Sequence, residues 1–111
     1  MSRSLRVDVG ETVHHVLNRA NGRAHIFFSD KEYAHFESLL LDGVHFYNMR
    51  ILAYVIMPNH WHLLLYPRND GDLRKSMQWL GTSHALRHHV RTKTIGEGHL
   101  YQGRFKSFPI E

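Results

Sequence analysis

Two histidines separated by one residue are the feature of this sequence most suited to chemistry. His60 and His62 flank Trp61 in an apolar stretch that continues with three leucines. Residues two apart on a β-strand point to the same face, with about 7 Å between their backbone positions. Two imidazoles that project together can clamp a divalent metal ion. Because first-row metal sites usually have three or more protein ligands, a purely structural pair stays open on spacing alone.

A second group of histidines lies later in the chain. His84, His88 and His89 belong to a total of eleven histidines, and the first two are one helical turn apart. We interpret them as a polar helix face or as residues that face phosphate, rather than as metal ligands.

Four strands and two helices are predicted around these residues. Alternating or continuous apolar residues predict strands over 11–19, 50–57, 60–66 and 104–110. Apolar residues at spacings of three and four predict helices over 30–46 and 72–91. The stripe of the second helix consists of Leu73, Met77, Leu80 and His84. Ser29 and Glu32 form a capping box at the first helix, and Asp70-Gly71-Asp72 is expected to cap the second. The stretch 50–57 is apolar on both alternating sets, as expected for a strand covered on two faces.

The order β-α-β-β-α-β predicts an α+β, ferredoxin-like sandwich. It would contain an antiparallel four-stranded sheet with two helices on one face. Right-handed crossovers place the first and third strands side by side in the middle. Trp61 and every second residue after it form a uniformly apolar set that is expected under the helices. The opposite face would carry the histidine pair together with Ile51, Ala53, Val55, Met57, Leu64 and Tyr66.

Composition indicates one globular domain over residues 1–111. Hydrophobic residues make up 42% of the chain and charged residues 22%. The absence of cysteine excludes disulfides, thiolate metal sites and cysteine nucleophiles. No apolar run approaches the length of a membrane span, and the N-terminus lacks the apolar core of a signal peptide. We therefore expect a cytoplasmic protein with no membrane partner.

The positive charge is concentrated in the last third of the chain. Residues 1–70 contain seven Lys or Arg and seven acids, whereas residues 71–111 contain seven Lys or Arg and three acids. A basic tract beside a neutral core is typical of a surface that binds a polyanion. A solvated helix face explains the charge equally well.

The segment from Met57 to Leu64, Met-Pro-Asn-His-Trp-His-Leu-Leu, resembles the signature of the HUH single-tyrosine transposases, which cut single-stranded DNA. More closely, the chain is similar to the REP-associated tyrosine transposases. Three other segments match this branch in order and spacing: 15–19, 51–55 and 98–107. The resemblance covers residues 11–111.

This resemblance implies a metal-dependent DNA reaction. His60 and His62 would hold Mg²⁺ or Mn²⁺, which polarises the scissile phosphate. A tyrosine would attack the phosphorus and form a 5′-phosphotyrosine, and the reverse attack would rejoin the DNA. The partner would be single-stranded DNA with small imperfect hairpins, in a bacterial, nucleoid-associated setting. His15 and Arg19, on the first strand, are expected near this site.

The sequence departs from the family pattern at the nucleophile. The family's tyrosine lies in a Tyr-Ile-x-x-Asn-Pro-like segment, on a helix after the last strand that commonly brings a further metal ligand. This chain stops at residues 109–111, and none of its five tyrosines matches. We therefore expect the fold core and the metal clamp without the nucleophile. A catalytically inactive module that binds DNA hairpins is the alternative function.

Two surfaces are expected to make contacts. DNA would meet one basic surface with Tyr101 near it, either stacked on a base or packed. Its cations would be Arg87, Arg91, Lys93, Arg104 and Lys106. The apolar histidine face has no cover of its own, so we expect self-association there, plausibly as a two-fold homodimer. Pairing through the edge strand at 104–108 is a second route.

Overall fold

A computed structural model describes residues 8–22, 24–93 and 98–110. Along the chain it contains β1 (Val13–Arg19), α1 (Asp30–Tyr47), β2 (Ile51–Met57), β3 (His60–Leu65), α2 (Asp72–Thr92) and β4 (Lys106–Ile110). The predicted order is confirmed, and each boundary lies within two residues of its predicted position. Within the described ranges, no helix is long and apolar enough to cross a membrane.

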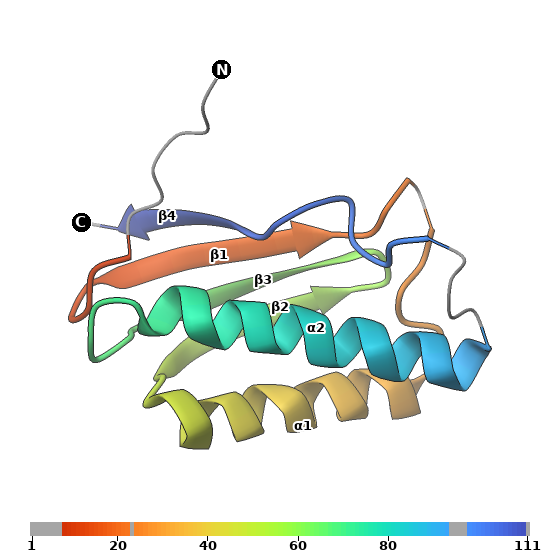
Figure 1. Cartoon of the computed structure of the whole chain (residues 1–111), viewed down its shortest axis with the longest axis horizontal. Coiled ribbons are helices and arrows are strands. Elements are labelled where there is room, and N and C mark those ends of the chain that lie inside the picture. Colours follow the sequence, from red (N-terminus) through yellow and green to blue (C-terminus); the bar gives the residue numbers. More distant parts are fainter. Residues whose placement is uncertain (1–7, 23, 94–97, 111) are drawn as a thin grey trace.

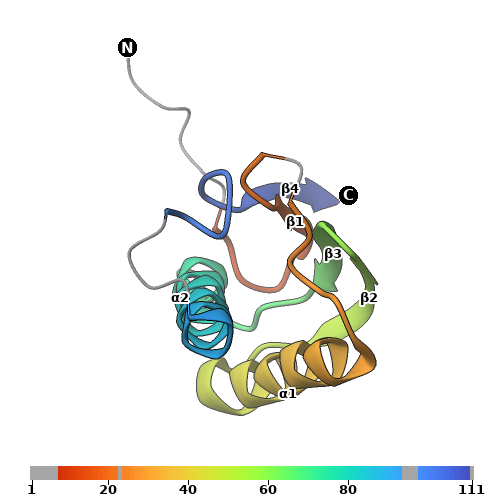
Figure 2. The same cartoon turned by 90° about the vertical axis from the view of Figure 1, so that its right-hand side faces the viewer.

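The four strands form one antiparallel sheet in the order β2-β3-β1-β4. The first and third strands occupy the middle, as predicted. Both helices pack on the same side of the curved sheet, as Figures 1 and 2 show from two directions. The predicted ferredoxin-like α+β sandwich is therefore confirmed. One face of the sheet is covered by the helices, and we call the other the open face.

The core lies between the helices and the covered face. Trp61, Leu63 and Leu65 of β3 are buried there, whereas the residues between them are half-buried on the open face. The stripe predicted on the second helix is buried as well: Leu73, Met77, Leu80 and His84. Burial of one large apolar side chain contributes about 1.5–3 kcal/mol, so this alternation fixes which residues the open face presents.

Strand β2 is less covered than predicted. It is an edge strand, as the predicted strand order implies, and its residues 52–55 are exposed rather than covered on two faces. Val55 and Met57 pair with His62 and His60 as predicted, but a bulge interrupts the register between Ile51 and Ala53. Ile51 therefore packs against the core, and its predicted place on the open face is wrong. An extra residue in a strand reverses the alternation beyond it, which an all-apolar pattern cannot indicate.

The two helices begin in different ways. Ser29 Oγ accepts the backbone N–H of Glu32 at 3.4 Å, and the Glu32 carboxylate accepts the N–H of Phe28, one residue before the predicted partner. At α2 the N-cap is Gly71, whose φ of 87° favours glycine, and no side chain caps the helix. Asp70 instead accepts the backbone N–H of Gly10, which ties the segment before β1 to the start of α2.

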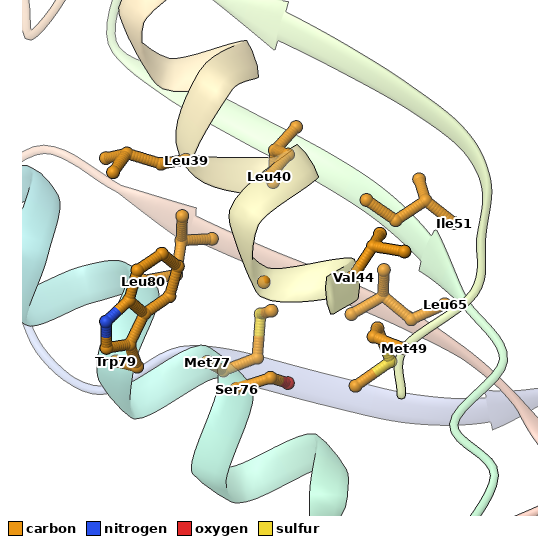
Figure 3. A pocket seen from close by; sticks show the side chains of 11 residues that line it. Leu39, Leu40, Val44, Met49, Ile51, Leu65, Ser76, Met77, Trp79 and Leu80 are labelled. Atoms are coloured by element: carbon orange, nitrogen blue, oxygen red, sulfur yellow. The ribbon is translucent and has the colours of Figure 1, made fainter. Parts of the chain in front are cut away.

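A small apolar hollow remains between α1 and α2 (Figure 3). Its volume is about 10 Å³, close to the space of one water-sized probe. Leu40 and Val44 approach it from α1, and Met77 and Trp79 from α2. The two helices are thus closely packed around this hollow.

Candidate metal centre and basic groove

His60 and His62 project together from β3 onto the open face. Both are half-buried, and their ring centroids are 5.2 Å apart with the ring planes nearly perpendicular. Trp61 between them points into the core and is 1% exposed. The prediction that the two imidazoles share a face is confirmed, because the alternation of β3 is fixed by its apolar side.

Each of the two rings has one nitrogen engaged by a neighbouring side chain. His60 Nδ1 lies 2.7 Å from Asn59 Oδ1, and His62 Nδ1 lies 2.9 Å from His15 Nε2. The rings of His15 and His62 are almost parallel, with centroids 5.1 Å apart. Neither Nε2 of the pair has a hydrogen-bond partner among the described residues. Each ring can therefore still offer a lone pair to a cation.

The environment keeps His62 uncharged. Partial burial lowers the pKa of His62, and positive charge on His15 or His60 would lower it further. A metal-binding imidazole must be neutral, so this shift favours the form that binds.

A groove of about 510 Å³ runs beside the histidine pair. It is lined by Leu17, Asn18, Arg19, His60, His62, Gln102, Gly103, Arg104 and Lys106. Backbone pairing brings the segment before β4 to this place: Gln102 N–H donates to the Arg19 carbonyl at 3.0 Å. The Asn18 side chain also donates to the Gly103 carbonyl at 3.3 Å. Three cations from two distant segments thus meet the two imidazoles.

The donor set suits a divalent cation that is held weakly. Within the described residues, no group of three or more His, Asp or Glu is placed to hold a metal ion. His60 and His62 would therefore supply two ligands and leave the other positions to water and to phosphate oxygens. Mg²⁺ and Mn²⁺ accept oxygen ligands, and Mg²⁺ commonly keeps several waters beside substrate phosphates.

Two of the five cations expected on one basic surface line the groove. Arg104 and Lys106 line the groove with Arg19, as described above, whereas the described part of the groove includes none of the predicted cations of α2. Arg91 forms a 3.5 Å salt bridge with Glu32 of α1. The charges of Arg87 and Arg91 both act on His35 of α1 and help to lower its pKa, after burial. These two arginines therefore face α1, and Lys93 follows at the end of α2.

Tyr101 is buried and does not lie on a surface. Its hydroxyl accepts the indole N–H of Trp61 at 2.9 Å and is hydrogen-bonded to His84 Nδ1. Burial raises the pKa of Tyr101, so the phenol stays protonated. The ring is 9% exposed and contacts the rings of Trp61 and His84, so burial disfavours stacking on a base. The alternative that it packs is correct.

The prediction of a polar or phosphate-facing histidine group on α2 is wrong for two of its members. His84 is 1% exposed and His88 is also buried. Burial, followed by the charges of His88, His35 and Arg91, lowers the pKa of His84 to about 3. The place of His84 in the apolar stripe was the available signal for its burial.

Two residues of the site were not singled out from the sequence. Asn59 was assigned only to the turn, although it directly precedes His60. Gln102 lies within a segment that matched the family but carries no charge. Proximity in the chain could have indicated Asn59, whereas the position of Gln102 depends on its pairing with the end of β1.

Known proteins share the sequence pattern and the fold of this chain. Residues 8–111 match the model of a family described as "Transposase IS200 like". The chain belongs to the IS200-like transposase family. No curated protein sequence matches it significantly.

Two solved structures share the fold of this family member. One is a REP-associated tyrosine transposase bound to a REP hairpin, with a TM-score of 0.75 and 18% identity. That match covers 100% of this chain and 63% of the other, so the chain spans less than two thirds of that relative. The second, assigned as a transposase of Deinococcus radiodurans, has a TM-score of 0.68 and 19% identity, with coverages of 99% and 87%.

Proposed function

We propose that this IS200-like transposase chain binds single-stranded DNA folded into small hairpins and holds Mg²⁺ or Mn²⁺ beside the DNA backbone. The groove carries this proposal, because it joins His60 and His62 to Arg19, Arg104 and Lys106. The REP hairpin bound to the relative supports the choice of DNA. Such a partner implies work at the nucleoid, in the bacterial cytoplasm.

The residues of the groove divide the task. Arg19, Arg104 and Lys106 attract the phosphates and fix their position, because guanidinium and ammonium groups pair well with phosphate oxygens. His60 and His62 hold the cation by their Nε2 atoms. A bound divalent cation polarises a phosphate and offsets the charge that develops in its displacement.

Matched charge removals test the DNA-binding groove. Anisotropy of a labelled imperfect hairpin with single-stranded flanks is measured over a range of salt concentrations. Lys106→Ala is expected to weaken binding several-fold and to lower the salt slope by about one. Lys75→Ala removes the same charge from an exposed position on α2 outside the groove, and binding should change less than about twofold. Equal losses of hairpin affinity in both variants, or binding that does not change with salt concentration, would contradict the proposal that DNA binds in the groove.

The cations of α2 belong to the same experiment. Arg87, Arg91 and Lys93 lie outside the groove, so their replacement by alanine is expected to cost less affinity than Arg104→Ala. A larger loss of affinity at these positions would indicate that DNA binds at the end of α2 and not in the groove.

Cleavage and rejoining through a phosphotyrosine are proposed for the family reaction, with a narrower role for these 111 residues. Among the described residues, no tyrosine lines the groove, and Tyr101 is buried on the other side of the sheet. We therefore propose that this chain binds hairpin DNA without covalent attachment. The chain is mixed with hairpin DNA and Mn²⁺ and run on a denaturing gel, where no adduct is expected. An adduct that disappears when one of the five tyrosines is changed would overturn this part of the proposal.

A further inference from the structure

The two candidate ligands are held in the same manner. His60 and His62 each use Nδ1 in a hydrogen bond to a neighbouring side chain. For His60 the direction of this bond is determined, because Asn59 Oδ1 is an amide oxygen and can only accept. The proton of neutral His60 therefore lies on Nδ1, and the lone pair lies on Nε2.

For His62 the bond alone does not determine the proton, since either imidazole could donate. His62 lines both the basic groove and an apolar hollow of about 430 Å³, and His15 lines that hollow but not the groove. The contact with His15 occupies Nδ1 of His62 and leaves Nε2 without a hydrogen-bond partner among the described residues. Nε2 carries the lone pair that a cation requires only when Nδ1–H donates to His15.

We propose that His15 and Asn59 are positioning residues that fix His62 and His60 in the tautomer whose Nε2 can bind a divalent cation. This inference rests on the proposed function and deepens it, because it separates the residues that hold the cation from those that prepare them. Free histidine in water prefers the proton on Nε2, so each neighbour must override that preference. Second-shell hydrogen bonds of this kind fix both the tautomer and the ring orientation of metal ligands.

Both positioning residues are themselves held in place. His15 lies on the central strand β1, paired with Leu64 on one side and Phe108 on the other. Its ring also contacts the Phe108 ring, with centroids 6.3 Å apart. Asn59 lies in the two-residue turn between β2 and β3, where its carbonyl accepts the N–H of Ala20 at 2.8 Å. These contacts hold the backbone of both residues and the ring of His15.

The first test reads the tautomers directly and uses no metal. Imidazole ¹⁵N chemical shifts are recorded at pH 8 with chelator, with each signal assigned by single His→Gln replacement. His60 and His62 are both expected as Nδ1–H tautomers. His15→Phe, which keeps a ring against Phe108, should move His62 toward the Nε2–H form and leave His60 unchanged. Asn59→Ala should do the reverse. A His62 that carries its proton on Nε2 in the unmodified chain would overturn the proposal.

The second test measures Mn²⁺ affinity from the EPR signal of the free ion. His15→Phe is expected to weaken binding about 10- to 100-fold. His15→Gln keeps a carbonyl that can accept from His62 Nδ1–H, so it should recover affinity to within about threefold. If Gln and Phe lose affinity equally, His15 is a ligand and its positioning role is wrong.

The two tests separate the inference from the proposed function. If the tautomers are as expected but Mn²⁺ does not bind, the cation is removed from the proposed function. The roles of His15 and Asn59 in fixing the tautomers are then still supported. Mn²⁺ binding with His62 in the Nε2–H form would keep the cation and overturn the positioning role.

Discussion

On the covered face of the sheet, His84 lies between the two helices and is 1% exposed, with Nδ1 bonded to Tyr101. On the open face, His62 is half-buried and lines the groove, with Nδ1 bonded to His15. The pKa of His84 falls to about 3, mainly through burial, whereas the smaller shift at His62 keeps a neutral and accessible ring. Surroundings, rather than residue type, therefore decide which histidine can bind a ligand.

The two faces meet in one strand. Trp61 donates its indole N–H to Tyr101 on the covered side, and the histidines on either side of it face the groove. Packing on one face thus sets the orientation of the other through the alternation of β3. If this separation is correct, changes on each face should affect stability and cation binding independently.

The largest expected effect is the loss of the cation. Replacement of both His60 and His62 by alanine removes the two Nε2 donors, so Mn²⁺ binding should fall below detection by calorimetry or EPR. The control is His35→Gln, which changes a half-buried histidine on the covered side and should leave affinity unchanged. Mn²⁺ binding that survives the double change, or disappears in the control, would place the cation elsewhere.

The next largest effect is a loss of stability in acid that is caused by His84 on the covered face. Because the pKa of folded His84 is about 3, the unfolded chain binds its proton first as pH falls below 6.5. At pH 4.5, which is two units below the unfolded pKa of 6.5, His84 should reduce the free energy of unfolding by about 3 kcal/mol relative to pH 7. The loss continues toward pH 3 and then levels off. It is measured by urea denaturation at several pH values.

His84→Gln keeps a neutral partner for Tyr101 and should flatten that pH dependence. A smaller slope should remain, since burial and nearby charges also lower the pKa values of His35 and His88. His60→Gln, on the open face, should keep the full slope. Parallel curves for His84→Gln and the unmodified chain would show that His84 is not the buried acid-sensitive group.

The parts of this molecule that depend on local pattern could be predicted from the sequence. The spacing of His60 and His62 implies a shared face, and the apolar stripes of both helices predict the sides that pack. The bulge at Ile51 could not be predicted, because β2 is apolar in either register. Its continuous apolar residues also suggested cover on two faces, whereas residues 52–55 are exposed.

Parts of the site that depend on distant pairing escaped prediction. Tyr101 was expected near the basic surface. Its hydrogen-bond partners in the core, Trp61 and His84, are 40 and 17 residues away in the sequence, so no local pattern indicates them. The groove also needs residues 102–104 beside the end of β1, a contact that no local pattern contains. Charge counts suggested one basic surface of five cations, and two of them, Arg104 and Lys106, line the groove.

A third effect tests whether the two faces are independent. Tyr101→Phe removes a hydroxyl that serves both Trp61 and His84, and leaves buried polar atoms without a partner. We expect a loss of about 1–3 kcal/mol in the free energy of unfolding. Mn²⁺ affinity, measured where the variant is fully folded, should stay within about twofold. Tyr47→Phe, on a partly exposed ring of α1, is the control and should change stability little. A large loss of Mn²⁺ affinity in Tyr101→Phe would show that the buried hydrogen bonds also orient the open face.

The smallest expected effect is a gain in stability on the covered side. Gly43 lies in α1 beside the apolar hollow of Figure 3, and an added Cβ would meet the Trp79 ring at 3.6 Å, an ordinary contact. Gly43→Ala should raise the free energy of unfolding by about 0.5–1 kcal/mol, because glycine is a poor helix former. Gly10→Ala is the opposite case, since its Cβ would lie 2.6 Å from the Arg68 carbonyl oxygen and the backbone would have to move. Thermal unfolding should therefore shift upward for the first variant and downward for the second, with Mn²⁺ affinity unchanged in Gly43→Ala. A gain in stability that also altered Mn²⁺ affinity would mean that α1 packing reaches the open face, and the separation of the two histidine groups would be incomplete.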